Sequence, residues 1–226
     1  VVADSITDGV KKTTGGIIVF TDTETELAEN AIEELVKGFA DPRIDCVVGQ
    51  QSSKNGNSAF WKYENKVKEL ESNIGCVSGA NDTIFAVRKD KMPIVDEKVK
   101  HKPFYIATSI TQAGADVVYT PKAIAYEIPT EGDNFAKHVE DAKGYWQALR
   151  LFPRMLFPRK GSFAYVSHRV MKWFVWLNLI VSLFVSGMLA FSSQMMFVIF
   201  LLQIILYMVL LVFGKKASDG NLGKIM

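Results

Sequence analysis

Two long apolar stretches near the end of the chain set the first expectation. Residues 173–191 and 195–213 each run for nineteen residues without a charged side chain. At ~1.5 Å per residue a helix of that length spans about 28 Å, close to the ~30 Å hydrocarbon core of a bilayer. Only the uncharged residues 192–194 connect the two stretches. The pattern predicts two transmembrane helices, joined in a tight hairpin over residues 173–213.

A helical hairpin buried inside a soluble core is the alternative interpretation. Such a hairpin needs only one apolar face on each helix. Residues 197–202 are apolar at every position, so apolar side chains cover every face of the second helix. The sequence therefore favours two membrane-spanning helices over a hairpin buried in a soluble core.

Basic residues flank both apolar stretches. Arg169 and Lys172 precede the first, and Lys215 and Lys216 follow the second. Because Lys and Arg mark the cytoplasmic side of membrane helices, we expect a multi-pass protein of the cell membrane with both ends in the cytoplasm. Residues 1–149 and a tail over 214–226 then lie on that side.

The segment before the first apolar stretch mixes aromatic and basic side chains. Arg150, Arg154 and Arg159 alternate with apolar residues at three-to-four spacing, and Pro153 and Pro158 interrupt the run. This pattern is typical of short amphipathic helices in the headgroup region of a bilayer, which we predict for residues 150–172. A solvated linker is the alternative, and the high aromatic content disfavours it.

Residues 1–149 alternate between β-branched runs and amphipathic stretches. Such alternation is typical of an α/β fold, in which helices cover a sheet. We expect residues 1–149 to form an α/β domain with strands over 16–20, 46–49, 77–87 and 116–126 and with helices over 26–39, 58–73 and 104–113.

Composition and charge narrow the class of protein. Residues 1–149 carry a net charge of −6 and residues 150–226 a net charge of +8, while 49% of all residues are hydrophobic. This excludes a disordered chain, and Cys46 and Cys76 alone cannot support a disulfide-stapled domain. Nucleic acid is not an expected partner, because the basic residues flank a segment too apolar to follow a phosphate backbone.

Two acidic residues follow the clearest strand. Asp22 and Glu24 lie at the carboxyl end of residues 16–20, which is where α/β sheets place their chemistry. Carboxylates at positions i and i+2 can hold a divalent cation and leave sites for a diphosphate. Alternatively, they stabilise the N-terminus of the helix predicted from residue 26.

The order of these segments resembles the membrane-integrated family-2 glycosyltransferases, the group of cellulose synthase, hyaluronan synthase and poly-N-acetylglucosamine synthase. The likeness covers almost the whole chain. It is carried by residues 16–25 with 39–43, by 60–65, 71–72, 78–81 and 85–88, by 104–127, and by 144–150 with 167–169.

The resemblance implies a partial GT-A-type, Rossmann-like domain that uses a nucleotide-diphosphate sugar and Mg²⁺ or Mn²⁺. Asp22 and Glu24 match the family's Asp-x-Asp position. Gln147 and Arg150 match its Gln-x-x-Arg-Trp position, with Leu151 in place of the Trp. These two would border the acceptor entrance, although an ordinary interfacial glutamine and a headgroup-binding arginine fit the same pattern. By the same resemblance Gly79, Ala80 and Asn81 lie near the acceptor terminus.

One departure concerns the general base. Where the family places an acidic pair that removes the acceptor proton, this sequence reads Lys102 and Pro103. Asp96 and Glu97 lie seven and six residues upstream of Pro103. His101 is the nearest titratable alternative, although a surface histidine is the more ordinary interpretation.

The other departure is that the nucleotide-binding beginning of the family has no counterpart in this sequence. The leading hypothesis is therefore the C-terminal portion of a membrane glycosyltransferase of polysaccharide-synthase type, in which a missing N-terminal part or a partner subunit completes the site. Its partners would be a nucleotide-diphosphate sugar, a growing glycan or lipid acceptor, and the bilayer. The alternatives are a non-catalytic pseudoenzyme or membrane subunit, and a polyprenyl-phosphate sugar transferase.

Overall fold

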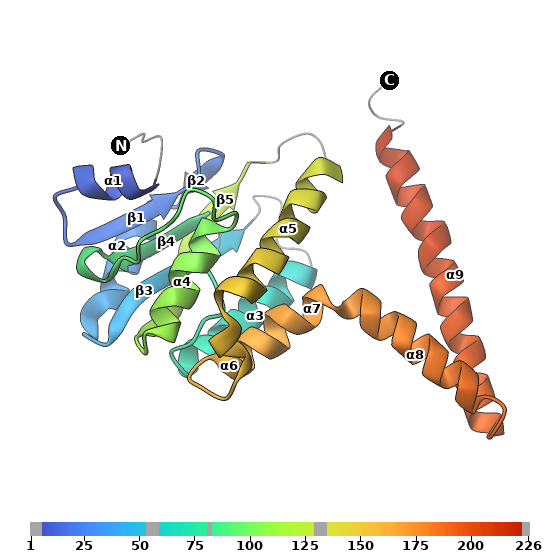
Figure 1. The fold of residues 1–226 in the computed structure, drawn as a ribbon. Helices are drawn as coiled ribbons and strands as arrows, with labels where there is room; N and C mark the ends of the chain where they lie inside the picture. The colour runs from blue at the N-terminus through green and yellow to red at the C-terminus, as the bar shows by residue number, and fades with distance from the viewer. Residues whose placement is uncertain (1–5, 53–58, 81–82, 129–134, 223–226) are drawn as a thin grey trace. The chain divides into compact units, whose positions relative to one another are not determined.

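A computed structural model describes residues 6–52, 59–80, 83–128 and 135–222 (Figure 1). The chain divides into two compact units, Val1–Met171 and Lys172–Met226. The first unit contains all the strands found in the described residues, and the second is helical. The two units are described separately below.

A five-stranded mixed sheet forms the centre of the first unit. Its strand order is β1-β4-β3-β5-β2. Strands β1, β3 and β5 run in one direction, and β4 and β2 run in the other. The strands are β1 (Ile17–Thr21), β2 (Thr25–Leu27), β3 (Ile44–Ser52), β4 (Ile84–Arg88) and β5 (Asp116–Glu127).

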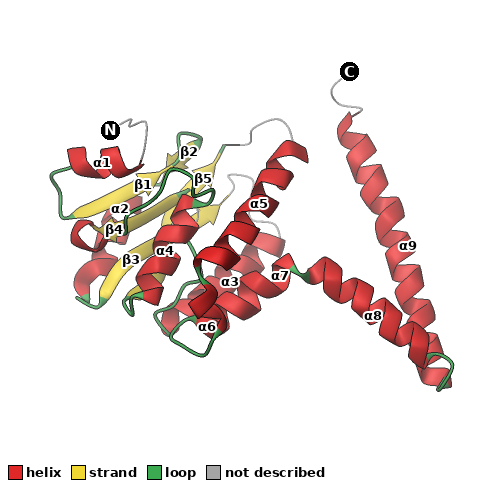
Figure 2. Ribbon diagram, in the orientation of Figure 1, coloured by secondary structure: helices red, strands yellow, loops and turns green. Residues whose placement is uncertain are grey.

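Alternating side chains of the central strands build a core on each face of the sheet. Val48 and Phe85 belong to one cluster, together with Ile106 of helix α4 (Lys102–Gln112). Val47 belongs to the other, together with Leu35 of helix α2 (Ala31–Lys37). Because successive strand residues point to opposite faces, the sheet is covered on both sides, and Figure 2 shows helices on either side of the strands. The predicted α/β class is confirmed.

The sheet cannot be flat. Strands β1 and β2 lie at its opposite edges, yet only three residues connect them. Four strand spacings amount to about 19 Å, whereas the four residue steps from Thr21 to Thr25 reach at most about 14 Å. The register supplies the bend, because Val48 faces Tyr119 whereas Gln50 already faces Ile124. The end of β5 therefore curls back, and β2 pairs with it near the end of β1.

The helix predicted over residues 26–39 is wrong at its beginning. Thr25–Leu27 is strand β2, in which Glu26 pairs with Tyr126, and the backbone N–H of Ala28 still donates to Ile124. Helix α2 starts only at Ala31 and passes into a short helical turn, η1 (Gly38–Ala40). The apolar spacing was compatible with a helix, but pairing with a strand about 100 residues later takes up these backbone groups.

The other predicted elements of this unit are mostly confirmed. Helix α3 (Ala59–Asn73), helix α4 and strands β3 and β5 lie where the periodicity placed them. The strand predicted over 77–87 reduces to β4, because Gly79 has a φ of +94° and interrupts the extended run. Helix α1 (Ile6–Lys12) and the short turn η2 (Lys89–Lys91) were not predicted.

The first unit ends in a chain of short helices. Helix α5 (Phe135–Leu151) starts before the predicted amphipathic segment and includes Arg150. After it come η3 (Pro153–Leu156), α6 (Ser162–Ala164) and a π-helix, η4 (Tyr165–Val170). Tyr165 and His168 of the π-helix are buried, so this segment packs on its own unit with part of its side chains.

The second unit contains two helices, α8 (Val175–Leu189) and α9 (Gln194–Leu222), after α7 (Met171–Trp173) at the boundary. The predicted helix over 173–191 is shorter than expected, because Phe174 leaves the helical conformation, with φ of −103° and ψ of 11°. In the part of the chain that the structure describes, no single helix is long and apolar enough to cross a membrane. Helices 162–173 and 175–189 meet that criterion only together, as a bent pair.

A row of polar side chains joins α8 to α9. The amide nitrogen of Gln203 donates to the hydroxyl oxygens of Ser182 and Tyr207, at 2.8 and 2.9 Å. The amide oxygen of Gln203 accepts from the hydroxyl of Ser186 at 2.7 Å, and Tyr207 donates to the carbonyl of Leu179. Many large apolar side chains are exposed along α8 and along α9 up to Val209, so hydrogen bonds contribute specifically to the pairing of the hairpin.

Candidate functional site

The carboxyl ends of the parallel strands β1, β3 and β5 meet at one edge of the sheet. Asp22 and Glu24 lie at that edge, in the three-residue connection from β1 to β2, and both are exposed. The carboxylate of Asp22 accepts a hydrogen bond from the backbone N–H of Thr23 at 2.7 Å, and the backbone oxygen of Glu24 accepts from Ile128 at 3.0 Å. Hydrogen bonds at both acidic residues thus fix the connection between β1 and β2. Helix α2 begins only at Ala31, so the alternative role as caps of a helix starting at residue 26 is wrong.

The donor set suits a hard divalent cation only in part. Carboxylate oxygens are the ligands that Mg²⁺ and Mn²⁺ prefer, and Asp22 and Glu24 supply two. Within the described ranges no group of three His, Cys, Asp or Glu residues could hold a metal ion. Two carboxylates leave most of an octahedral shell open, so water and a bound diphosphate would have to supply the further oxygens.

Gln147 contacts the segment that precedes α4. Its amide oxygen accepts from the backbone N–H of Lys100 at 2.9 Å, and its amide nitrogen donates to the carbonyl of Lys98 at 2.8 Å. The structure therefore brings Gln147 against the segment just before Lys102 and Pro103. Arg150 lies one turn later on α5 and is exposed.

His101 packs against helix α5. Its ring stacks on Tyr145, with 5.6 Å between ring centroids, and a Cβ atom at Gly144 would collide with it. Pro103 occupies the first turn of α4, directly after Lys102. The structure thus gives His101 a packing partner, and Lys102 and Pro103, which the resemblance assigns to the general-base position, supply no carboxylate.

The segment expected near the acceptor is buried and closely packed. Gly79 and Ala80 are buried, and a Cβ atom at Gly79 would collide with the ring of Phe104 on α4. Asn81, the third residue of this expected site, lies outside the described residues.

Sequence reasoning missed a buried polar cluster beside this segment. Glu64 and Glu71 of α3 contact the two ring nitrogens of His168, and Glu71 also contacts Ser78. Glu64 and Glu71 lie seven positions apart on one helix, and so share a face. That spacing was the available signal, but nothing local indicated a partner about 100 residues later.

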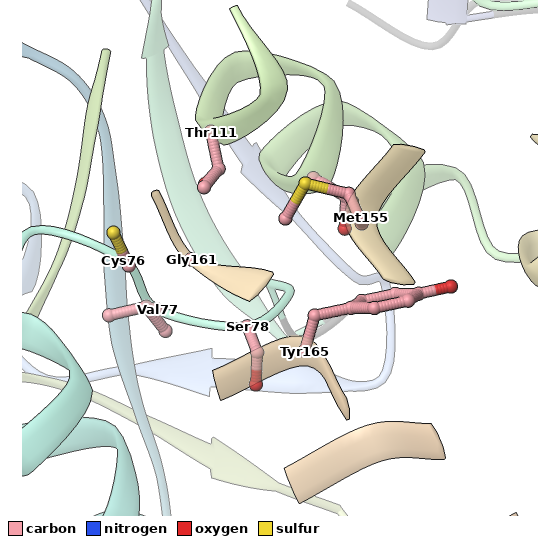
Figure 3. Close-up of a pocket in the computed structure, with 8 residues that line it drawn as sticks. Cys76, Val77, Ser78, Thr111, Met155, Gly161 and Tyr165 are labelled. Atoms are coloured by element: carbon pink, nitrogen blue, oxygen red, sulfur yellow. The ribbon is translucent and has the colours of Figure 1, made fainter. Parts of the chain in front are cut away.

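A small pocket opens next to the cluster, between residues 76–78, α4 and the segment after α5. Figure 3 shows Thr111 and Met155 opposite Cys76 and Ser78, with Tyr165 beside them. Its cavity volume is about 10 Å³, far below the about 300 to 1,000 Å³ of ordinary ligand sites. The pocket is too small for a nucleotide sugar.

Comparison with family models adds one match. Residues 2–99 match the model of Glycosyl transferase family 2. This range includes Asp22, Glu24 and residues 79–81, and it ends before Gln147. Comparison with curated proteins gives no match.

The solved structures similar to this chain include the following two. The first is the mannosyltransferase PcManGT from Pyrobaculum calidifontis in complex with GDP-Man and Mn²⁺, with a TM-score of 0.58 and 16% identity over 88% of this chain and 62% of that one. The second is GalNAc-T7 with UDP, GalNAc and Mn²⁺, with a TM-score of 0.38 and 14% identity over 76% and 40% of the two chains. The second TM-score is too low to carry an argument.

At 16% identity the first likeness shows a shared fold alone, and this chain spans less than two thirds of the length of that mannosyltransferase. The acidic sheet edge and the Gly79 segment both fall within the region that the family model matches. Residues 2–99 therefore match a glycosyl transferase family 2 domain, within a chain whose fold is similar to that of a GT-A-type mannosyltransferase.

Proposed function

We propose that this chain acts in a membrane glycosyltransferase of polysaccharide-synthase type, which transfers a sugar from a nucleotide-diphosphate sugar to an acceptor hydroxyl. One observation carries the proposal: the exposed Asp22 and Glu24 lie together at the carboxyl edge of the sheet, inside the region that matches family 2. Among the described residues neither carboxylate has a basic partner, so both are available to a ligand at the end of the sheet where α/β folds place their chemistry.

In this proposal Asp22 and Glu24 hold Mn²⁺ or Mg²⁺ together with the diphosphate of the donor. The cation would supply charge neutralisation of the departing diphosphate. The acceptor oxygen forms the new bond to the anomeric carbon while the bond from that carbon to the diphosphate oxygen breaks. The bonding electrons leave with the nucleoside diphosphate, and the acceptor proton passes to water or to an oxygen of the departing diphosphate. Asp22 and Glu24 orient the donor for this step, and no covalent link to the protein is needed.

Gln147 and Arg150 belong to the acceptor side of the proposed site. Gln147 holds the segment at Lys98 and Lys100 by two backbone hydrogen bonds. It therefore fixes the chain just before α4, where the acceptor would approach. Arg150 is exposed one turn further along α5 and is free to meet an anionic group there.

The membrane setting of the proposal rests on the second unit. Large apolar side chains of α8 and α9 are exposed, among them Phe184 at 68%, Met188 at 63% and Leu202 at 60%. Exposed apolar surface of this extent marks an interface with a partner or a bilayer. We infer that residues 173–213 enter the bilayer and that residues 150–172 lie at its cytoplasmic surface.

A transfer assay on membranes containing the full chain tests the enzymatic part. A panel of labelled donors begins with GDP-mannose and UDP-sugars, and the product is analysed as polymer, free glycan or lipid-linked sugar. We expect Asp22→Asn and Glu24→Gln each to lower incorporation by at least about a hundredfold. The matched control is Asp90→Asn, an exposed acid after β4, whose carboxyl end lies at the opposite sheet edge.

Each outcome of this assay decides something. Incorporation by Asp22→Asn equal to that of the wild type would reject the metal role. Lipid-linked product alone would identify a polyprenyl-phosphate sugar transferase in place of a polysaccharide synthase. If Asp90→Asn also lost activity, the effect would not be specific to the carboxyl end of the sheet, which would count against Asp22 and Glu24 as the cation ligands.

A second candidate function is a non-catalytic membrane subunit with the same scaffold. The observation that favours it is the general-base position, where Pro103 starts α4 and His101 is stacked on Tyr145. Titration calorimetry of the full chain with a nucleoside diphosphate and Mn²⁺ separates the two. Metal-dependent binding that Asp22→Asn abolishes supports a working site, whereas absence of binding in the wild type supports the scaffold.

A further inference from the structure

Three buried ionisable side chains lie together, away from the acidic sheet edge. Glu64 and Glu71 of α3 and His168 of the π-helix η4 are only 4%, 6% and 5% exposed. Burying charged groups is costly unless they are paired and hydrogen-bonded. The three side chains must therefore pair with one another through hydrogen bonds.

Glu71 is the acceptor at the centre of this cluster. One of its carboxylate oxygens, Oε2, accepts from the backbone N–H of Ser78 at 2.9 Å. The other, Oε1, accepts from the hydroxyl of Ser78 at 2.8 Å and lies 2.8 Å from Nδ1 of His168. Two donors from Ser78 favour the ionised carboxylate, so Nδ1 carries a proton and donates to Glu71.

The second ring nitrogen then requires a further proton. Nε2 of His168 lies 3.1 Å from Oε2 of Glu64. A neutral imidazole has one N–H, which Glu71 already receives, and an ionised carboxylate can only accept. The contact with Glu64 is a hydrogen bond only if one extra proton lies between Nε2 and Glu64.

The hydrogen bonds to the two carboxylates outweigh the groups that oppose that proton. Burial and the charge of the neighbouring Arg169 disfavour a charge on His168. The hydrogen bonds to Glu64 and Glu71 favour it more strongly, so the pKa of His168 is raised. The direct hydrogen bonds therefore hold the extra proton.

The same cluster fixes the backbone at Ser78. Its N–H is bound by Glu71, and its carbonyl accepts from Nε of Arg169 at 2.6 Å. The guanidinium of Arg169 also lies over the ring of Phe104, 6.0 Å from the centroid, and that ring leaves no room for a side chain at residue 79. Elements α3, α4 and η4 therefore hold this turn from three sides.

We propose that Glu64, Glu71 and His168 form a buried clamp that binds one proton and ties the π-helix to the turn at Ser78 and Gly79. Resting on the proposed function, the clamp positions the acceptor side of the site, and Glu71 and His168 are positioning residues. The segment leading to the apolar hairpin is thereby connected directly to the turn that would meet the acceptor.

Nuclear magnetic resonance of the full chain in detergent micelles, labelled with ¹⁵N-histidine, tests the clamp without any assay of transfer. The chain has three histidines. We expect one ring at neutral pH with imidazolium-type nitrogen shifts and two ring protons that exchange slowly with water, and we expect this signal to disappear in His168→Gln. If all three wild-type rings titrate near a pKa of about 6.5 with fast-exchanging protons, the clamp is overturned.

A second measurement follows the turn itself. In hydrogen exchange read by mass spectrometry, Glu71→Gln is expected to speed exchange of the peptide containing Ser78 by at least about tenfold, since it weakens a charge-assisted hydrogen bond. Glu69→Gln is the matched control, because Glu69 lies on α3 but is exposed beside Lys66. Equal exchange in Glu71→Gln and wild type would contradict the positioning role.

Where transfer is measured, Glu71→Gln should raise the acceptor KM and leave the donor KM unchanged. A clamp seen by resonance in a chain without transfer would reject only the proposed function.

Discussion

Glycine positions show how strongly single residues constrain this fold. Gly79 and Gly114 both have φ above +90°, whereas Gly16 lies outside the left-handed region. A Cβ atom would meet nothing within 4 Å at Gly16 or Gly114, but at Gly79 it would collide with Phe104. Substitutions at the three positions therefore distinguish the effect of backbone strain from that of a steric clash.

Replacing these glycines by alanine should produce a graded loss of stability. Gly16→Ala is expected to be neutral or slightly stabilising, because it restricts the unfolded chain. Gly114→Ala should cost about 1 kcal/mol through backbone strain, and Gly79→Ala about 3 kcal/mol or more, because overpacking is added. Chemical denaturation of the purified chain measures the order, and a Gly79→Ala variant as stable as Gly114→Ala would contradict the packing against Phe104.

The raised pKa of His168 makes stability depend on pH. Because the folded-state pKa lies above the unfolded value, its contribution is complete below about pH 6.5 and is lost as the pH rises through the folded pKa. We expect the free energy of unfolding of the wild type to fall over this range relative to His168→Gln. Denaturation at a series of pH values checks this, and parallel profiles for the two proteins would show that His168 does not hold the proton.

At the scale of elements, pairing with a distant element determines secondary structure where the local sequence pattern fits more than one type. Strand β2 and helix α2 share one apolar run, and the pairing of β2 with β5 determines where the strand ends and the helix begins. The hairpin of α8 and α9 shows the same principle with side chains, since Gln203 connects the two helices through Ser182, Ser186 and Tyr207.

Gln203→Leu should weaken this hairpin. It removes the hydrogen bonds that connect Ser182 and Ser186 to α9. Interhelical hydrogen bonds of this kind contribute about 0.6 to 1.7 kcal/mol in membrane proteins. Unfolding of the full chain in mixed micelles, followed by tryptophan fluorescence, measures the loss. Gln194→Leu is the control, because Gln194 is exposed at the start of α9. Equal stability of both variants would mean that apolar packing alone holds the helices.

At the scale of the whole molecule, the proposal places residues 1–149 and both ends on one side of a membrane. Two cysteines allow a direct test, because Cys46 and Cys76 are buried and burial raises the pKa of both thiols. Such thiols react slowly. Cysteines added at exposed positions therefore report on a low background.

We expect Ser193→Cys, between α8 and α9, to react with a membrane-impermeant maleimide only from the outer side. Lys12→Cys, exposed in the last turn of α1, should react only in inverted vesicles. Reaction of both positions from the same side would reject the transmembrane hairpin. The unsubstituted chain provides the background in both vesicle types.

The sequence by itself determined what depends on near neighbours. Hydrophobic periodicity located α3, α4, β3 and β5, and the acidic end of β1 was visible as Asp22 and Glu24 directly after a β-branched run. These features could be predicted because side-chain direction follows the local backbone period.

Only the tertiary structure decided which distant residues meet. It assigned Thr25–Leu27 to a strand, broke the helix expected over 173–191 at Phe174, and placed Gln147 against Lys98 and Lys100. It also joined His168 to Glu64, 104 positions earlier. In such contacts a distant polar partner compensates the cost of burying a polar group. No local sequence pattern specifies that partner, so only the folded arrangement identifies it.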